Sequence, residues 1–290
     1  MDHNNQLNEM DSKLEKEFSN IWDGLLHEKC CKKKDCGWDN MTKNNLEYNG
    51  YYLPYIGEHY VNQKDKILFL GINMNEYGGG ENKKNALREL YIDQKIGAIH
   101  WIREGARKIT FDKGEENKPQ PQPDGKNWYG SPLYEYVACI ATILTQKQSI
   151  DIAQLIEQLK TNSKEILHKK AEALKSIAFT NLVKCAPKNK RSQPLPQMIN
   201  NCFDQILNYE IQNINPKPEF IIILGASYRE IIKDIFQGEN IENISEGIYL
   251  LRGKIKSLTY TIFILNWYKK WDRLKEFGKH IIDLDKISIS

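Results

Sequence analysis

Four short apolar runs, separated by longer stretches with helical spacing, constrain the fold most strongly. The runs cover residues 66–72, 177–184, 219–226 and 260–266. Each run is rich in β-branched or aromatic residues and is bounded by polar residues or glycine, which is typical of strands. The runs are continuous rather than alternating, which indicates a sheet that is covered on both faces. We therefore predict an α/β fold with three layers (α/β/α) and a central four-stranded parallel sheet.

The intervening stretches predict the helices and the domain organisation. Helical spacing of apolar residues appears in 131–144, 152–174 and 196–211. The chain has 290 residues and a mass of 33.9 kDa, which is enough for one large α/β domain or two small ones. We expect residues 1–20 to be a polar lead-in and residues 21–290 to form a single domain. The proline- and glutamine-rich segment 112–128 is expected to be an insertion loop.

Charge and hydropathy exclude some classes of protein. Lys and Arg number 41 and Asp and Glu number 38, so the net charge is +3, which does not by itself indicate a nucleic-acid partner. The apolar runs fall well short of the ~18 residues that a membrane span needs. The N-terminal residues are polar and acidic, unlike a signal peptide. We expect a cytoplasmic protein, monomeric and without a membrane partner.

The residues at the ends of the apolar runs are candidates for a binding site, because ligands of open α/β sheets bind at the carboxyl ends of the strands. Asn73 follows the first run, Asn181 lies in the second and Asn266 ends the fourth. An amide both donates and accepts hydrogen bonds, as reading the edge of a nucleobase requires. A single asparagine is more often a turn or cap residue, but three are expected to converge here. The glycine run 78–80 matches neither a Walker loop nor a dinucleotide fingerprint.

The sequence of residues 180–202, TNLVKCAPKNKRSQPLPQMINNC, resembles the uracil-DNA glycosylase superfamily. It is most similar to the iron–sulfur branch (families 4 and 5), in which an Asn precedes Val-Lys-Cys, a loop with Pro, Asn and Arg, and a second Cys. The segment Gly71-Ile72-Asn73 is similar to the water-positioning motif of the superfamily, in the Asn form of the mismatch-specific and single-strand-selective branches. The resemblance implies a monofunctional DNA glycosylase that flips out uracil or a modified pyrimidine, hydrolyses its N-glycosidic bond and leaves an abasic site.

The resemblance also implies roles for individual residues. Asn181 would read the Watson–Crick edge of the flipped pyrimidine, and Tyr77 would stack on the base or guard its C5 position. Asn73, helped by Glu76, would position the attacking water. The remaining base-binding candidates are Gly71, Ile72 and Met74. No lysine stands out as a Schiff-base nucleophile, so no lyase step is expected.

The last motif departs from the family pattern. Where the family has His, this chain has Asn266, followed by Trp267 and Tyr268, and His280 lies too far along to replace it. Asn266 would donate to the base carbonyl as a neutral group. Because of this departure, the sequence does not determine which base is excised. A bulky modified cytosine in foreign or viral DNA would make the protein a defence enzyme, whereas uracil would indicate DNA repair.

Basic and aromatic residues provide candidate DNA contacts. Two lysine-rich runs lie next to the cysteines, and a metal site would bring them together on one face. The loop after the last motif would face the minor groove, with its tryptophan as a wedge unless that residue is buried at the start of a helix. The DNA-binding candidates are Lys188, Lys190, Arg191, Lys269, Lys270 and Trp271.

Six cysteines raise the question of a metal site. Cys30, Cys31 and Cys36 fall within seven residues, which is more typical of ligation than of disulfides in an intracellular chain. The resemblance implies a [4Fe–4S] cluster on Cys31, Cys36, Cys185 and Cys202, with Cys30 as the alternative to Cys31. Zinc would accept the same four thiolates. Cys139 lies in an apolar helical stretch and is expected to be a packed thiol.

Two other classes of function stay open at this point. A non-catalytic iron–sulfur DNA-binding relative would keep the fold and the cluster but lack the activity that the family's His supports. A zinc-stabilised α/β enzyme of unrelated chemistry is the third hypothesis. Release of a base from DNA would distinguish the first hypothesis from both.

Overall fold

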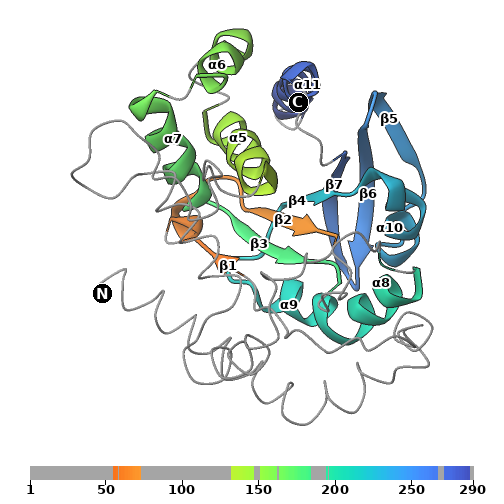
Figure 1. Ribbon diagram of the computed structural model, residues 1–290. Helices are drawn as coiled ribbons and strands as arrows, with labels where there is room; N and C mark the ends of the chain where they lie inside the picture. Colours follow the sequence, from red (N-terminus) through yellow and green to blue (C-terminus); the bar gives the residue numbers. More distant parts are fainter. Residues whose placement is uncertain are drawn as a thin grey trace, which may run out of the picture.

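A computed structural model describes residues 55–57, 59–72, 132–146, 151–161, 163–183, 194, 196–266 and 271–287. Its strands form one seven-stranded sheet in the order β1-β3-β2-β4-β7-β6-β5 (Figure 1). The strands are β1 (Tyr55–Ile56), β2 (Ile67–Gly71), β3 (Ala178–Asn181), β4 (Phe220–Leu224), β5 (Ile241–Ser245), β6 (Ile248–Ile255) and β7 (Leu258–Leu265).

The four predicted strands are β2, β3, β4 and β7, and they form the parallel centre of the sheet. β3 pairs with β2, β2 with β4, and β4 with β7, each in parallel. The α/β class is therefore confirmed, but the prediction of a four-stranded, wholly parallel sheet is wrong. β1 adds to β3 in the antiparallel direction, and β5 and β6 extend the sheet beyond β7 as antiparallel strands.

The additional strands lack the continuous apolar runs that marked the other four. Residues of β6 alternate between buried and more exposed positions toward its end, and β5 is mostly polar and partly exposed. The turn between β6 and β7 consists of Lys256 and Ser257, with Lys256 at a φ of 54°. Because Asn and Gly are the usual residues for a positive φ in such a turn, the hairpin carries no strong sequence signal.

Helices cover both faces of the sheet, so the molecule has three layers (Figure 1). One face carries α5 (Pro132–Gln146), α6 (Ile152–Leu159), α7 (Lys164–Leu174) and α11 (Trp271–Ile287). The other carries α8 (Pro196–Cys202), the π-helical turn η3 (Phe203–Leu207), α9 (Asn208–Asn213) and α10 (Arg229–Ile235). Short 3₁₀ helices are η2 (Tyr60–Asn62) and η4 (Ala226–Tyr228).

The helix expected over 152–174 is two helices. The carboxylate of Asp151 accepts a hydrogen bond from the backbone N–H of Ala153 at 2.6 Å and caps α6. That helix ends at Leu159, and α7 begins at Lys164. The buried Lys170 of α7 donates to the Leu159 carbonyl oxygen at 3.1 Å, which ties the end of α6 to α7.

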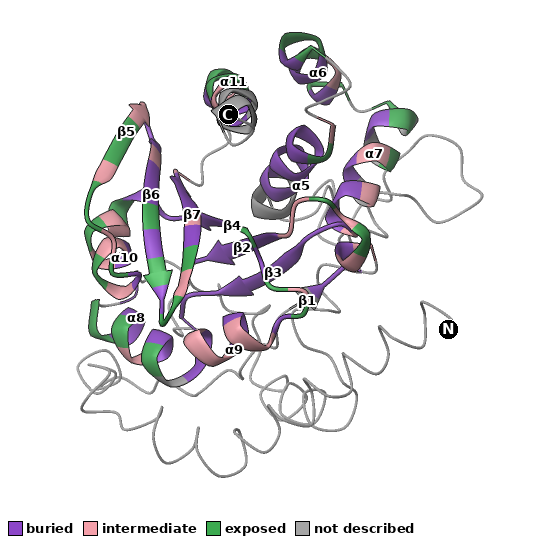
Figure 2. Ribbon diagram, turned by 180° about the vertical axis from the view of Figure 1, so that it is seen from behind, coloured by how far each residue is buried: buried purple, intermediate pink, exposed green. Residues whose placement is uncertain are grey.

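The central strands are almost wholly buried (Figure 2), and their residues divide between two hydrophobic clusters, one on each face of the sheet. We call them the α5 cluster and the α8 cluster after a helix in each. Phe69 and Phe179 belong to the α5 cluster, whereas Leu70 and Ile223 belong to the α8 cluster. Successive side chains of a strand point to opposite faces, so the continuous apolar runs supply both clusters at once.

A buried polar pair anchors β3 to α9. Thr180 donates through its hydroxyl to a carboxylate oxygen of Glu210 at 3.0 Å, and both residues are almost fully buried. The pair lies directly before Asn181 and holds the end of β3 against the helix on the α8 side. Within the helices that the structure describes, none combines the length and apolar character needed to cross a bilayer.

Candidate functional site

The carboxyl ends of the parallel strands meet at one edge of the sheet. Gly71 at the end of β2 is in register with Asn181 of β3 and with Leu224 of β4, and Leu224 is in register with Leu265. Asn266 directly follows Leu265. Asn181 and Asn266 thus lie at the same edge, as predicted, although β2 and β4 separate them. The three spacings between neighbouring strands from β3 to β7 add up to roughly 14 Å. The two amides would therefore have to approach a ligand from opposite sides.

The Asn181 side chain is the most informative group at this edge. It is only 5% exposed and lies on the α5 face, since Phe179, two residues earlier, is in the α5 cluster. No hydrogen bond to its amide is formed among the residues that the structure describes. The amide atoms of Asn181 are not among the fully enclosed polar atoms without a partner in this part of the chain, so the amide keeps some accessible surface at this edge.

Gly71 makes room for this amide. A Cβ atom at Gly71 would lie 2.3 Å from Asn181 Oδ1 and 3.4 Å from Cζ of Phe179. The Asn181 side chain therefore lies across the end of β2, where any residue larger than glycine would displace it. The backbone continues the strand pairing beyond β3, with the N–H of Leu182 bonded to the Gly71 carbonyl oxygen at 2.7 Å.

Ile72 lies on the other side of the edge. A Cβ atom at Gly225 would lie 2.0 Å from Cδ1 of Ile72, so Gly225 provides the space for that side chain. Ile72 packs against the α8 cluster, opposite the face that holds Asn181. Its carbonyl oxygen accepts from the N–H of Val183 at 2.8 Å. Ile72 thus supports the end of β2 from the α8 side.

Asn266 is part of a second group at the end of β7. Its backbone N–H donates to the Gly247 carbonyl oxygen at 3.0 Å. Gly247 has a φ of +77°, and a Cβ atom there would lie 2.6 Å from Asn266 Nδ2 and 2.9 Å from Nε of Arg273. Arg273 is 6% exposed and donates through Nε to the Glu246 carbonyl oxygen at 3.2 Å. This turn therefore accommodates an amide and a guanidinium together.

Tyr136 of α5 lies next to the guanidinium. Burial raises the pKa of Tyr136 to about 12, although the neighbouring Arg273 acts in the opposite direction. The phenol is therefore neutral at physiological pH. Sequence reasoning missed Arg273 and Tyr136. The spacing of residues in this helix could have indicated that Arg273 is buried, since it falls on the same helical face as the apolar Phe277 and Ile281.

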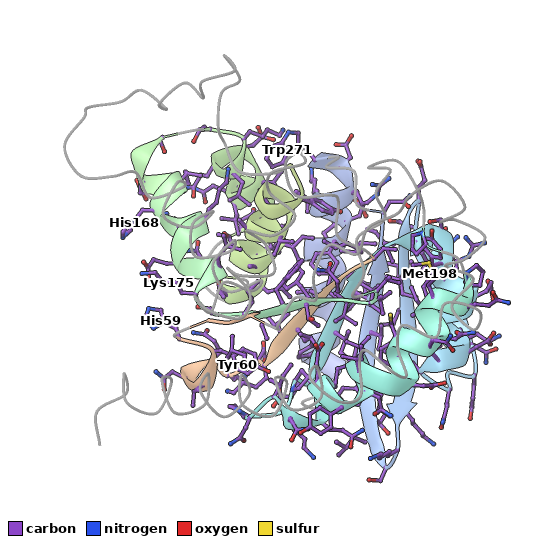
Figure 3. The ribbon with its side chains drawn as sticks, turned by 60° about the horizontal axis from the view of Figure 1, so that its bottom comes forward. His59, Tyr60, His168, Lys175, Met198 and Trp271 are labelled. Carbon is purple, nitrogen blue, oxygen red and sulfur yellow. The ribbon has the colours of Figure 1, made fainter. Side chains whose placement is uncertain are left out.

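Trp271 and Cys202 are the other predicted site residues that the structure describes. Trp271 begins α11 and packs, partly buried, against the α5 cluster (Figure 3). Its contact with DNA stays a prediction. Cys202 ends α8 and is buried in the α8 cluster, which also contains Met198. Cys139 is buried in the α5 cluster, which confirms it as a packed thiol.

The remaining predicted residues lie outside the described part of the chain. The lead-in 1–20 and the loop 112–128 are also outside it. The residues concerned are Asn73, Met74, Glu76, Tyr77, Lys188, Lys190, Arg191, Lys269, Lys270, Cys30, Cys31, Cys36 and Cys185. In the described ranges, no group of three or more His, Cys, Asp or Glu residues is arranged to hold a metal ion.

No family model and no curated protein matches the chain. An assignment of function therefore depends on the motifs and on the geometry of this edge.

The contact between Gly71 and Asn181 predicts a coupling between two substitutions. Gly71→Ala should destabilise the protein by about 1–3 kcal/mol, because the new methyl group meets Asn181 Oδ1. Asn181→Ala removes that atom, so the double variant should recover about 1 kcal/mol or more relative to the sum of the single effects. Urea denaturation followed by circular dichroism measures all three variants.

Gly225→Ala is the matched control, because its methyl group would meet Ile72 rather than Asn181. Combined with Asn181→Ala, its effect should be additive within about 0.5 kcal/mol. Additivity of Gly71→Ala with Asn181→Ala would show that the amide does not lie over Gly71.

Proposed function

We propose that the chain is a monofunctional DNA glycosylase that removes uracil or a modified pyrimidine from DNA and leaves an abasic site. The observation that carries the proposal is the buried Asn181 amide at the carboxyl edge of β3. It lies over Gly71 and has no hydrogen-bond partner in the described ranges. The motifs around Asn181 and Gly71 that resemble the uracil-DNA glycosylase superfamily support the same assignment.

The position of the Asn181 amide favours a ligand role. Asn181 is only 5% exposed, but its amide atoms are not among the fully enclosed polar atoms without a partner in the described residues, so the amide keeps accessible surface at this edge. A flipped base would supply the missing hydrogen bonds, since a pyrimidine edge carries one donor and one acceptor side by side. The amide matches that pattern with one acceptor and one donor group. The buried setting strengthens these bonds, because water does not compete for them.

The reaction requires groups on both sides of the base. Asn181 approaches from β3, and Asn266 approaches from the end of β7 and would donate to a base carbonyl as negative charge develops there. Asn73 and Glu76 would place the water that attacks the sugar carbon. Tyr77 would stack on the base, with Met74 beside it. The transition state is oxocarbenium-like, so positioning of the water matters more than strong base catalysis.

Contacts with the DNA backbone would come from segments that flank this edge. Lys188, Lys190 and Arg191 follow β3, and Lys269 and Lys270 lie between β7 and α11. Both segments begin at the carboxyl ends of parallel strands, which is the edge that carries Asn181 and Asn266. Lysine and arginine side chains there would neutralise phosphates on either side of the flipped nucleotide.

Cys202 fits a role as a ligand of an iron–sulfur cluster. Its thiol is buried, and Val183, two residues before Cys185, belongs to the same α8 cluster. Val183 and Cys202 therefore lie on the same face of the sheet. Cys31 or Cys30, with Cys36, would complete four thiolates, which hold [4Fe–4S] or zinc. In this position the group would stabilise the loop that follows Asn181.

The proposal predicts release of a base from DNA. Purified protein is incubated with oligonucleotides that carry uracil or a 5-modified cytosine, and alkali then cleaves at abasic sites. We expect cleavage at one of these bases. Asn181→Ala should lower the rate by about 10²–10³-fold, as loss of one essential hydrogen-bonding group does, whereas the exposed Asn243→Ala should leave it unchanged.

The base that is released then distinguishes a role in DNA repair from a role in defence. Cleavage at uracil indicates a repair enzyme, and cleavage only at a modified cytosine indicates a defence enzyme. Tight binding to these DNAs without an abasic product would overturn the proposal in favour of a non-catalytic DNA-binding relative.

A second prediction concerns the metal group. Protein purified without oxygen should be brown, with absorbance near ~400 nm and about four irons per chain. Cys202→Ser should lose most of the absorbance and the iron. Cys139→Ser should keep both, since Cys139 lies on the opposite face of the sheet. A colourless protein with stoichiometric zinc would contradict the cluster assignment and leave the four-thiolate site in place.

A further inference from the structure

The amino edge of the sheet, opposite the candidate site, carries a group of exposed basic side chains. This edge is formed by the starts of β2, β4 and β7 and by the end of β6, because β6 runs antiparallel to β7. The backbone N–H of Glu219 donates to the Lys66 carbonyl oxygen at 2.8 Å, so the entries into β2 and β4 lie side by side. The exposed side chains, which we call the amino-edge cations, are Lys64, Lys217, Arg252, Lys254 and Lys256.

The charge of this edge is positive because few acidic residues oppose it. The segments 64–67, 217–220 and 252–261 contain six Lys or Arg residues and only two acidic residues. Within the part of the chain that the structure describes, Lys217, Arg252 and Lys254 form no ion pair. Lys256 donates to Oε1 of Gln212 at 2.7 Å, and this acceptor is neutral. The positive charge is therefore available to a partner.

Arg252 and Lys254 lie on the α5 face of the hairpin formed by β6 and β7. Ile248 and Leu250 of the same strand belong to the α5 cluster, and every second residue of a strand shares a face. The two apolar residues are buried, whereas the two cations are exposed. Figure 2 shows the same change toward the end of β6. The α5-side helices thus cover the hairpin near the candidate site and leave its far end open.

Threonine hydroxyls accompany both cations. Thr261 of β7 is opposite Arg252, and Thr259 is opposite Lys254. Directly opposed residues of an antiparallel pair have neighbouring side chains on the same face. Thr259 is exposed and Thr261 is partly exposed. Arginine, lysine and threonine side chains are the groups that contact phosphate oxygens of nucleic acids without reading the sequence.

A nucleic-acid backbone matches this surface in spacing and in charge. Arg252 and Lys254 are two residues apart on one strand, which corresponds to about 7 Å. Two cations at that separation, each beside a hydroxyl, can contact neighbouring phosphates of one strand. The α5 face here presents cations and hydroxyls rather than large apolar side chains, which a membrane surface would require.

The amino edge is too far from the candidate site to hold the same stretch of DNA. Seven residue steps separate Leu258 from Leu265 on β7, which corresponds to about 23 Å. This separation is larger than the Debye length of ~10 Å at 0.1 M salt. The amino-edge cations therefore act little on DNA bound at the carboxyl edge and are placed for a different segment.

We propose that the amino edge binds the phosphate backbone of a second DNA segment, so that one molecule bridges two duplexes. The choice of DNA as the polyanion rests on the proposed function, whereas the charge of the edge does not. Binding at this edge is electrostatic, independent of sequence and sensitive to salt. A second duplex held there keeps the protein close to DNA after the first target has been released.

The test uses the full-length protein and two duplexes. The immobilised duplex carries the released base on an uncleavable 2′-fluoro nucleotide, and the labelled duplex lacks that base. If no base is released, an unmodified immobilised duplex takes its place. The amino-edge variant is Arg252→Gln/Lys254→Gln, and Arg252→Lys/Lys254→Arg keeps its charge. The charge-matched control is Lys160→Gln/Lys279→Gln, which removes two exposed cations outside this edge.

We expect the wild type to capture the labelled duplex on the immobilised one. The amino-edge variant should reduce this capture about fivefold or more, and the salt dependence of capture should lose a slope of about 2 on logarithmic axes. The charge-retaining variant and the charge-matched control should behave as wild type. The rate of base release from a short duplex should stay within about twofold in all variants, because the edge lies beyond the screening length.

Three results would overturn the inference. The first is absence of capture by the wild type at low salt. The second is equal capture by the amino-edge variant and the charge-matched control, as bridging through dimers of the chain would give. The third is competition for capture by phosphatidylserine vesicles and not by unlabelled duplex, which would assign the edge to a membrane surface. Capture by the wild type without any base release would instead remove the proposed glycosylase function and leave the amino edge as a DNA-binding surface.

Discussion

The parallel pairing of β2 with β3 positions the group on which the candidate site depends. The register places Gly71 beside Asn181, and the absence of a side chain at Gly71 lets the amide lie across the end of β2. The pair formed by Thr180 and Glu210 holds the same strand end from the opposite face. The amide is thus fixed by rigid elements on both sides, as a group that must recognise one ligand geometry requires.

The two faces of the sheet contribute differently to this edge. The α5 face carries the Asn181 amide and the buried pair of Tyr136 and Arg273. The α8 face carries the apolar Ile72 and the buried thiol of Cys202. The side chains of Asn181, Tyr136 and Arg273 therefore lie on one side of the sheet, and those of Ile72 and Cys202 lie on the other.

The sequence predicts the parallel centre of the sheet because its strands are buried on both faces and therefore continuously apolar. It does not predict β5, which is mostly polar and partly exposed, or β6, whose residues alternate in burial toward its end, or the turn through Lys256 that connects β6 to β7. The edge position of Asn181 follows from its place at the end of an apolar run. The burial of Arg273 is not predicted from the sequence, because an arginine in the first turn of a helix usually points to solvent. Only the tertiary packing against Gly247 shows that it is buried.

The central claim is that the Asn181 amide reads a flipped pyrimidine, and its nuclear magnetic resonance signal tests this directly. The ¹⁵N-labelled protein is titrated with DNA that carries 2′-fluoro uridine or 2′-fluoro 5-hydroxymethylcytidine, which resist cleavage. The account predicts a large shift of the Asn181 side-chain amide with at least one DNA and none for the exposed Asn243. DNA binding that shifts backbone signals but leaves the Asn181 amide unchanged with both bases would contradict it.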